Sequence, residues 1–444
     1  MEHLVIIGNG ITGITTARHV RKISDKRITI ISAESDHFYS RPALMYIFMG
    51  HMRYPDTKPY EDWFWEKNKI ELLRGLVTEI DSDNKTLSLA DGSKIMYDQL
   101  VIATGSKSNK FGWPGQDLPG VQGLYSLQDL ELLEKNSVGA KRAVIVGGGL
   151  IGIELVEMLL SRKIPVTMLV REKSYWDNIL PQRESKLITR HILEHGIDLR
   201  CETNLKEIIA DPDGRVCAVK TENGEEISCE IVGLTPGVAP NIEVVKNSQI
   251  AAGRGILVND FFETNIPDVY AAGDCAEIVT PEGERNKIEQ LWYTGRMHGK
   301  ALAKTICGER TIYERGIWFN SAKFLDIEYQ TYGFVSNVPR KGESSFYWEH
   351  AEGRMCLHLV YNAQNHALVG VNIFGIRMRH TVFEKWLTEK RTLEYVLEHL
   401  CEANFDPEFF AEFESEFVAQ YNTQFPGQKL RLQGKRGLFN KIFA

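Results

Sequence analysis

The sequence has few cysteines, no excess of positive charge and no long apolar run. Its 444 residues include seven cysteines, of which the closest two, Cys217 and Cys229, stand 12 positions apart. Neither a Cys-x2-Cys nor a Cys-x4-Cys pair occurs, which excludes zinc ribbons, common iron–sulfur motifs and a redox dithiol between sequence neighbours. We therefore expect no metal site. Sparse, odd-numbered cysteine favours a reducing compartment, so we expect a cytoplasmic protein.

Charge and hydropathy exclude further classes of protein. The 52 Lys and Arg residues against 59 Asp and Glu give a net charge of −7, which argues against nucleic-acid binding through bulk positive charge. Hydrophobic residues make up 43% of the chain, enough for a globular core. The longest apolar stretch, residues 143–160, contains Glu154, Glu157 and four glycines, so we expect no transmembrane segment. The first residues carry no leader-like pattern and suggest a mature start.

One pattern of expected elements occurs twice. A short apolar strand runs into a glycine-rich turn, a helix and a second apolar strand, and the second copy begins about 140 residues after the first. The length predicts two or three domains, and the repeated pattern predicts that two of them bind nucleotides. The expected strands and helices are residues 4–7, 14–23 and 28–32 in the first copy, and 143–146, 153–160 and 166–170 in the second.

The first turn is Gly8-Asn9-Gly10-Ile11-Thr12-Gly13. In such a turn the first glycine allows a sharp bend, the second lets a pyrophosphate approach the backbone, and the third lets the helix pack on the strand. Glu34 follows Gly13 by 21 residues, at the end of the second expected strand, where an acid accepts ribose hydroxyls. The pattern predicts a dinucleotide site.

The second turn carries Gly147, Gly149 and Gly152 in the same context. No acid stands at Val170, where a partner for a 2′-hydroxyl is expected. Two cations follow and favour a 2′-phosphate, as in NADPH, whereas Glu172 and the glycine at 152 leave NADH open. The cations are Arg171 and Lys173.

With these turns, two further segments complete a resemblance to the two-dinucleotide-binding-domain flavoproteins, the pyridine nucleotide–disulfide reductase superfamily. The segments are residues 98–105, ending Ala103-Thr104-Gly105, and residues 266–274, ending Gly273-Asp274. The resemblance covers about residues 1–335. Within the superfamily the chain is most similar to NAD(P)H-dependent rubredoxin and ferredoxin reductases and the flavin part of assimilatory nitrite reductases, through residues 39–44, 233–241 and 318–321.

The resemblance implies an α/β fold of two Rossmann-like domains, for FAD and NAD(P), with a C-terminal α+β interface domain. It implies an FAD-binding domain of residues 1–111 and 236–310 and an NAD(P)-binding domain of residues 112–235. An interface domain of residues 311–400 and a helical extension and basic tail of residues 401–444 would follow. A homodimer is the usual outcome in the family.

The resemblance also implies site residues. For FAD these are Gly8, Gly10, Gly13, Ala33, Glu34, Arg41, Pro42, Val77, Ala103, Thr104, Gly105, Gly273, Asp274, Gln290, Leu291 and Trp292. For NAD(P)H they are Gly147, Gly149, Leu150, Ile151, Gly152, Glu154, Arg171, Lys173 and Gly233. Glu154, Tyr46 and Trp292 are the candidates closest to the reacting atoms, and the segment after Glu289 should start a helix aimed at the flavin.

Departures from the family pattern shape the expected function. Disulfide reductases carry a redox cysteine soon after the ribose acid, but residues 38–50 contain none, so no thiolate step is available there. Ferredoxin-reductase relatives often have a lysine where this chain has Tyr46. We expect an NAD(P)H oxidoreductase that passes electrons through FAD to an external acceptor, such as a small electron-carrier protein. The alternatives are a flavin-binding signalling protein that reacts slowly with NAD(P)H, or a quinone reductase or NAD(P)H oxidase.

The remaining expectations are structural. Residues 381–400 should form one helix, and Asp406-Pro407-Glu408 should start a last helix that buries a stripe of Phe405, Phe409, Phe413 and Phe417. Cys275 is interpreted as a small buried residue, and His298, His366 and His380 as ordinary core or surface residues. The basic tail, residues 427–444, is expected either to dock an acidic protein or an anionic membrane surface, or to be disordered.

Overall fold

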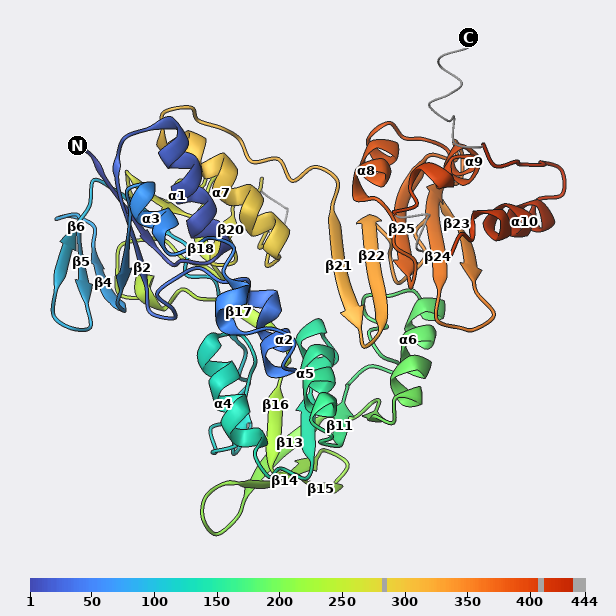
Figure 1. The fold of residues 1–444 in the computed structure, drawn as a ribbon, viewed down its shortest axis with the longest axis horizontal. Coiled ribbons are helices and arrows are strands. Elements are labelled where there is room, and N and C mark those ends of the chain that lie inside the picture. The colour runs from blue at the N-terminus through green and yellow to red at the C-terminus, as the bar shows by residue number, and fades with distance from the viewer. Residues whose placement is uncertain (282–285, 406–410, 434–444) are drawn as a thin grey trace. The chain divides into compact units, whose positions relative to one another are not determined.

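The computed structural model describes residues 1–281, 286–405 and 411–433 (Figure 1). The chain divides into two compact units. Unit 1 comprises Met1–Gly147, Met158–Val166 and Leu205–Arg315, and unit 2 comprises Gly148–Glu157, Thr167–Asn204 and Gly316–Ala444. The expected four-part domain division stays a prediction.

Unit 1 is built on a parallel sheet of order β19-β7-β1-β2-β3. Its central strands are buried on both faces, which is why they are continuous apolar runs. Two helices, α1 (Ile11–Ile23) and α7 (Trp292–Ile306), pack side by side in unit 1, as Figure 1 shows. The strands are β1 (His3–Ile7), β2 (Arg27–Ser32), β3 (Ile70–Arg74), β7 (Gln99–Ile102) and β19 (Val269–Ala271).

Close packing of α1 on α7 depends on two glycines of α7. A Cβ on Gly295 would lie 2.8 Å from Oγ1 of Thr12, and one on Gly299 would lie 2.7 Å from the Thr12 carbonyl oxygen. A side chain at either position would push the helices apart. The α7 helix that the sequence predicted after Glu289 is therefore present and packed on the helix of the first glycine turn.

Unit 1 contains a second set of parallel strands, in which β16 pairs with both β10 and β9. Its remaining sheets are small and antiparallel or two-stranded. The second set is β9 (Val121–Gln122), β10 (Ala143–Val146) and β16 (Ile231–Leu234). The small strands are β4 (Val77–Asp81), β5 (Thr86–Leu89), β6 (Lys94–Met96), β8 (Ser106–Ser108), β13 (Leu205–Ala210), β14 (Val216–Thr221), β15 (Glu226–Ser228), β17 (Val238–Pro240), β18 (Ile256–Val258) and β20 (Ala276–Ile278). The other helices are α2 (Leu44–Phe48), α3 (Trp63–Lys67) and α4 (Leu127–Ser137).

Unit 2 centres on an antiparallel sheet of order β21-β22-β25-β24-β23. It also holds a short parallel pair, β11 with β12, and helix α6, while helix α5 belongs partly to each unit. The strands are β11 (Val166–Leu169), β12 (Asp198–Arg200), β21 (Phe319–Phe324), β22 (Ile327–Gly333), β23 (Glu343–Glu349), β24 (Cys356–Asn362) and β25 (Leu368–Phe374). The helices are α5 (Leu150–Ser161) and α6 (Gln182–Glu194).

The expected single helix over residues 381–400 is wrong. The structure has α8 (His380–Thr388) and α9 (Leu393–Glu398), followed by a 3-10 turn (Leu400–Glu402). Lys390 between them adopts a left-handed φ of 52°, and the Thr392 side chain accepts a hydrogen bond from the Tyr395 N–H to start α9. The apolar residues therefore keep a helical spacing across a tight turn that divides the expected helix into two.

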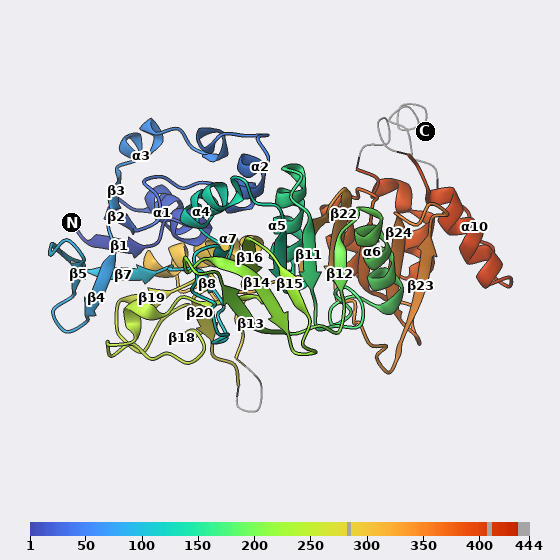
Figure 2. The ribbon, with the colours of Figure 1, turned by 90° about the horizontal axis from the view of Figure 1, so that it is seen from below.

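The last helix of the described residues begins at Glu414. α10 (Glu414–Gln424) lies against β23, as Figure 2 shows. Phe417 is fully buried and Phe413 packs on the same core, whereas Phe405 is 49% exposed. Phe409 and the expected cap at 406–408 lie outside the described residues, as does the tail from 434 onward.

The predicted α/β class with parallel sheets is confirmed. Among the described residues, no helix combines the length and apolar character needed to cross a bilayer.

Candidate functional site

In the first glycine turn, Gly10 has space for a side chain, whereas Gly8 and Gly13 have none. A Cβ on Gly8, whose φ is 112°, would lie 2.1 Å from the Ala103 carbonyl oxygen, and one on Gly13 would lie 2.0 Å from the Gly8 carbonyl oxygen. No described atom lies within 4 Å of a Cβ built on Gly10, which is the N-cap of α1. Space is therefore open at the start of α1, the place where a helix N-terminus binds an anion.

Glu34 follows β2 and is held by Arg41 in a two-pronged ion pair. Nη1 of Arg41 donates to Oε1 at 2.9 Å and Nη2 to Oε2 at 2.6 Å, while the Tyr39 hydroxyl and the Leu127 N–H also donate to Oε1. Burial raises the pKa of Glu34, but the hydrogen bonds from Arg41 outweigh it and hold the pKa below its ordinary value. Glu34 is thus an ionised acceptor at the end of β2, where a ribose is expected.

Asp274 lies at the end of β19 in a buried hydrogen-bonded chain. The Ser106 hydroxyl donates to Oδ2 of Asp274 at 3.0 Å, and Nε2 of Gln290 donates to the Ser106 oxygen at 2.8 Å. Burial raises the pKa of Asp274, and the Ser106 hydrogen bond opposes that rise. The fold thus brings together two predicted residues, Asp274 and Gln290, and Ser106, which follows the predicted Gly105 in sequence.

The remaining residues predicted for FAD fall around these two groups or at the surface. Ala103 and Val77 are buried in the unit 1 core, and the Thr104 hydroxyl donates to the Asn241 carbonyl at 2.6 Å. Leu291 is the N-cap of α7. Gly105 packs under the Tyr125 hydroxyl, and Gly273 packs against Thr12, since a Cβ on either would lie under 3 Å from the neighbouring oxygen. Two are exposed, Ala33 and Pro42.

Two candidates for the reacting region also lie in unit 1. The Tyr46 ring, in α2, stacks against the ring of His51 with centroids 6.2 Å apart. Trp292 is the first residue of α7, and its buried Nε1 has no hydrogen-bond partner among the described residues. The structure therefore gives Trp292 an unsatisfied donor at a helix start.

One buried group was not predicted. Nδ1 of His298, on α7, accepts from the Gly273 N–H at 3.1 Å, and Nε2 lies 3.3 Å from Oε2 of Glu289. Tyr313 donates to the same carboxylate at 2.7 Å, and Arg315 pairs with it at 3.2 Å. Burial raises the pKa of Glu289, but the hydrogen bonds from His298 and Tyr313 hold it below its ordinary value. A lone histidine inside a predicted helix gave no sequence signal for this network.

The second glycine turn repeats the plan of the first. A Cβ on Gly147, whose φ is 119°, would lie 2.4 Å from the Thr235 carbonyl oxygen, and Gly233 is buried in β16 opposite Ile145. A Cβ on Gly149 would meet no described atom within 4 Å. Three predicted residues then form the first turn of α5: Leu150, Ile151 and Gly152.

Charged residues predicted for NAD(P)H lie in unit 2. Burial, together with the neighbouring Glu157 carboxylate, raises the pKa of Glu154 to about 7. Arg171 is exposed after β11 and its Nε pairs with Glu172 at 3.0 Å, and Lys173 is also exposed. Two cations thus stand at the surface beside an acid that is already paired.

The seven cysteines are all free thiols. Cys275, next to Asp274, is fully buried, and its Sγ donates to the Ile102 carbonyl at 3.3 Å. Burial raises the pKa of the Cys275 thiol, so the thiolate is disfavoured. The interpretation of Cys275 as a small core residue fits this environment.

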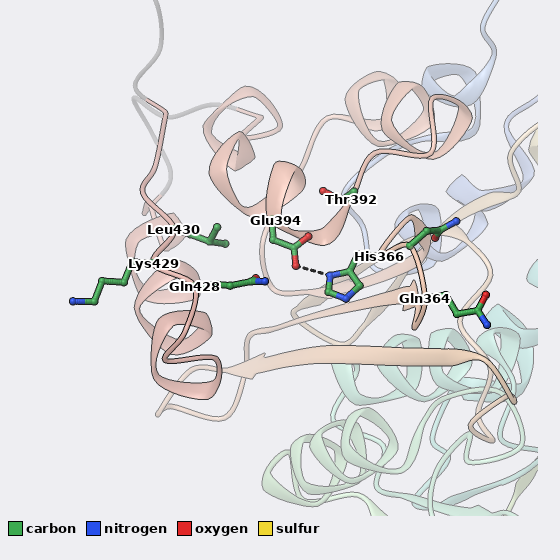
Figure 3. A pocket seen from close by; sticks show the side chains of 8 residues that line it. Gln364, His366, Thr392, Glu394, Gln428, Lys429 and Leu430 are labelled. Carbon is green, nitrogen blue, oxygen red and sulfur yellow. Dashed lines mark hydrogen bonds and ion pairs between the residues drawn. The ribbon is translucent and has the colours of Figure 1, made fainter.

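An open hollow of about 570 Å³ lies at the end of unit 2 (Figure 3). Nδ1 of His366 and Oε1 of Glu394 face each other at 2.7 Å, and the Lys429 side chain points away from them. The Tyr421 hydroxyl also donates to Glu394 at 2.8 Å. The His366 and Glu394 side chains are thus paired with each other, and, among the described residues, no glycine-rich turn lines this hollow.

Comparisons with known proteins agree with the two glycine turns. Residues 2–299 match the family model described as pyridine nucleotide-disulphide oxidoreductase. The chain is 30% identical to the nitrite reductase [NAD(P)H] of Bacillus subtilis over 340 residues, which cover 74% of this chain but 40% of that protein. It is 30% identical to the NADH-rubredoxin oxidoreductase of Clostridium acetobutylicum over 336 residues, covering 75% of this chain and 82% of that one.

A solved structure shows the same fold. The ferredoxin reductase for the CYP199A2 system of Rhodopseudomonas palustris superposes with a TM-score of 0.77 and 22% identity, covering 95% of this chain and all of that one. The resemblance proposed from the sequence motifs is confirmed.

Proposed function

The chain belongs to the pyridine nucleotide-disulphide oxidoreductase family, and from this we propose that it is an FAD-dependent oxidoreductase that takes hydride from NAD(P)H and delivers electrons to an external acceptor. FAD, when bound, supplies the step from two-electron to one-electron transfer. The observation that carries the proposal is the first glycine turn, closed at Gly8 and Gly13 and open at Gly10, followed by the ionised Glu34.

The residues of unit 1 fit the cofactor in three places. The open space beside Gly10 at the start of α1 suits a pyrophosphate, because N–H groups and the helix dipole favour negative charge. Glu34 suits the adenosine ribose as a hydrogen-bond acceptor. The chain of Gln290, Ser106 and Asp274 supplies polar groups for a polyol, and the unsatisfied Nε1 of Trp292 offers a donor at the start of α7.

No disulfide step is part of the proposal. Residues 38–50 contain no cysteine, and the cysteine nearest the predicted site, Cys275, is buried with its thiol donating to a backbone carbonyl. Electrons would therefore leave without passing through a thiolate of this chain.

For the nicotinamide nucleotide we propose NADPH, with the pyrophosphate at the turn of Gly147 and Gly149. Exposed Arg171 and Lys173 suit a 2′-phosphate. Glu154, with a pKa near neutrality, carries little charge beside a nicotinamide at acidic pH. Steady-state kinetics with NADPH and NADH, on the wild type and on Arg171→Ala with Lys173→Ala, tests the preference.

For the acceptor we propose a small electron-carrier protein, since the C. acetobutylicum relative is named for rubredoxin. The chain spans 40% of the B. subtilis nitrite reductase, so that protein's activity gives no acceptor for this chain. We also propose a homodimer in the cytoplasm, and light scattering after size-exclusion chromatography tests the dimer.

The deciding experiment is anaerobic reduction of the purified flavoprotein by NADPH and by NADH, followed by turnover with rubredoxin, ferredoxin, a quinone and oxygen. Rapid bleaching of the flavin band and fast turnover with a carrier protein are expected. A flavin band that neither nucleotide bleaches would overturn the proposal. Slow reduction with a persistent charge-transfer band would favour a signalling role, and fast turnover only with quinone or oxygen would favour a quinone reductase or oxidase.

A further inference from the structure

Two histidines and an aspartate converge on one point of unit 2, apart from every residue discussed for FAD and NAD(P)H. His191 and His195 lie one turn apart at the end of α6, and Asp326 lies in the turn between β21 and β22. Nε2 of His191 is 2.5 Å from Oδ1 of Asp326, and Nε2 of His195 is 3.4 Å from the same oxygen. One ligand atom from each residue lies within 4.8 Å of the other two. In Figure 1, α6 lies beside the ends of β21 and β22 where this turn occurs.

The hydrogen bonds of His195 leave the lone pair of its Nε2 facing the Asp326 carboxylate. The His195 ring uses Nδ1 toward the His191 carbonyl oxygen, 2.9 Å away, and since a carbonyl only accepts, Nδ1 carries the hydrogen. A neutral His195 then has a bare Nε2, which points at Oδ1 of Asp326, a second acceptor. Two acceptors at 3.4 Å repel unless a cation lies between them. A proton on His195 or a metal ion meets this need.

The surroundings favour a metal ion in three ways. A backbone carbonyl that fixes Nδ1–H is the usual outer contact of a metal-bound histidine, because it directs Nε2 to the ion. His191 is fully buried, whereas the Asp326 and His195 side chains are 58% and 32% exposed, so one side of the cluster is open to water. Three protein ligands and an open position form the usual zinc site with a bound water.

The two distances to Asp326 require little movement, and the third, between the imidazole nitrogens, lies within 4.8 Å. Ligands of a tetrahedral zinc ion lie about 3.4 Å apart, given bond lengths of about 2.0–2.1 Å. The His195–Asp326 pair already has this spacing, and the His191–Asp326 pair must open by less than about 1 Å. The second carboxylate oxygen, Oδ2, faces Arg354 at 3.7 Å, and Arg354 also pairs with Glu194 at 3.7 Å, so the nearby positive charge is itself balanced.

We propose that His191, His195 and Asp326 bind one late first-row divalent ion, with Zn²⁺ as the probe of choice. Two imidazoles and one carboxylate are ligands suited to zinc, cobalt and nickel. The ion would tie the end of α6 to the β21–β22 turn and so hold unit 2 together at that edge. This proposal replaces the expectation of no metal site.

The test is equilibrium dialysis of the full chain, without a polyhistidine tag and after treatment with a chelator, against Zn²⁺. The variants are Asp326→Asn and His195→Gln, both at partly exposed positions. The matched control is Glu194→Gln, which removes a neighbouring carboxylate that faces Arg354 but not the proposed ion. Zinc K-edge X-ray absorption identifies the ligands, and thermal unfolding with and without Zn²⁺ reports stability independently of activity.

The expected result is one equivalent of Zn²⁺ whose affinity falls by more than about 100-fold in Asp326→Asn and in His195→Gln, beyond the about 10–100-fold cost of losing an outer contact. Glu194→Gln should retain binding within about tenfold. The wild type should show two imidazoles and no sulfur ligand, and Zn²⁺ should raise its melting temperature but not that of Asp326→Asn. Binding that both variants retain, equal loss in Glu194→Gln, a zinc–sulfur distance near 2.3 Å, or no stoichiometric zinc in the wild type would overturn the proposal.

Discussion

The backbone N–H of Gly273 donates a hydrogen bond to Nδ1 of His298 at 3.1 Å. Gly273 precedes Asp274, and its φ of 80° places it in the left-handed region that favours glycine. The histidine therefore holds the backbone at the point where Asp274 turns toward Ser106. Since Nε2 of the same ring faces Glu289, the position of Asp274 depends on a buried network on α7.

We expect His298→Ala to lower both stability and FAD retention. The substitution leaves the buried Gly273 N–H without its acceptor, at a cost of about 1–3 kcal/mol in the free energy of unfolding. Glu289 loses one contact but keeps those to Tyr313 and Arg315. Urea unfolding and reconstitution of the apoprotein with FAD measure the two effects. His37→Ala, at a partly exposed pair with Asp62, is the control and should change neither by much. Wild-type FAD affinity in His298→Ala would show that the network does not position Asp274.

The ion pair of Glu34 and Arg41 predicts a pH dependence. Because the pKa of Glu34 is below its ordinary value of 4.5, the pair stabilises the fold above that pH and the benefit is lost as pH falls through the lower folded-state pKa. Glu34→Gln removes the benefit and leaves a half-buried Arg41 without its carboxylate, at a cost of about 1–3 kcal/mol near neutral pH.

Unfolding of both proteins between pH 3 and pH 7, as a function of denaturant, measures this difference. We expect the gap in unfolding free energy between wild type and Glu34→Gln to be constant above about pH 5 and to shrink below it. A difference in unfolding free energy that does not change with pH would mean that Arg41 does not lower the pKa of Glu34.

The raised pKa of Glu154 predicts a pH dependence of stability opposite in sign to that of Glu34. Its pKa is raised to about 7, so the folded state binds a proton that the unfolded state releases near 4.5, and wild-type stability falls as pH rises between these values. The Glu154→Gln variant has no carboxyl to ionise, so its stability does not fall in this way as the pH rises. Relative to wild type it should gain stability from about pH 5 to pH 7, on the order of 1 kcal/mol per pKa unit, and stay level above. Glu226→Gln, at an exposed strand position, is the control and should show no such trend.

Most of the fold that the sequence predicted depends on local patterns. The two glycine turns, the strands beside them and the start of α7 follow from residue spacing, because a glycine without room for a Cβ is needed wherever helix meets strand closely. The family resemblance supplied the roles of Glu34 and Asp274, and the structure shows both as hydrogen-bonded carboxylates.

What the sequence did not predict depends on contacts between distant segments. Lys390 breaks the helix expected over residues 381–400 with a left-handed turn that periodicity does not reveal. His298 is important only because Gly273 and Glu289 meet it in space. Asp326 joins His191 only through the pairing of β21 with β22, 135 residues away, so no local pattern indicates the cluster.

The clearest test of the first turn compares two glycines three residues apart. Gly10 has a φ of −70° and open space where a Cβ would lie, so Gly10→Ala should fold with a free energy of unfolding within about 1 kcal/mol of wild type. Its methyl group would occupy the space proposed for the pyrophosphate, so FAD affinity should fall by at least about tenfold, or about 1.4 kcal/mol. Gly13→Ala would place a Cβ 2.0 Å from the Gly8 carbonyl and should unfold the turn. FAD titration of the two apoproteins, with circular dichroism for folding, separates the effects, and a well-folded Gly10→Ala protein with wild-type FAD affinity would place the cofactor elsewhere.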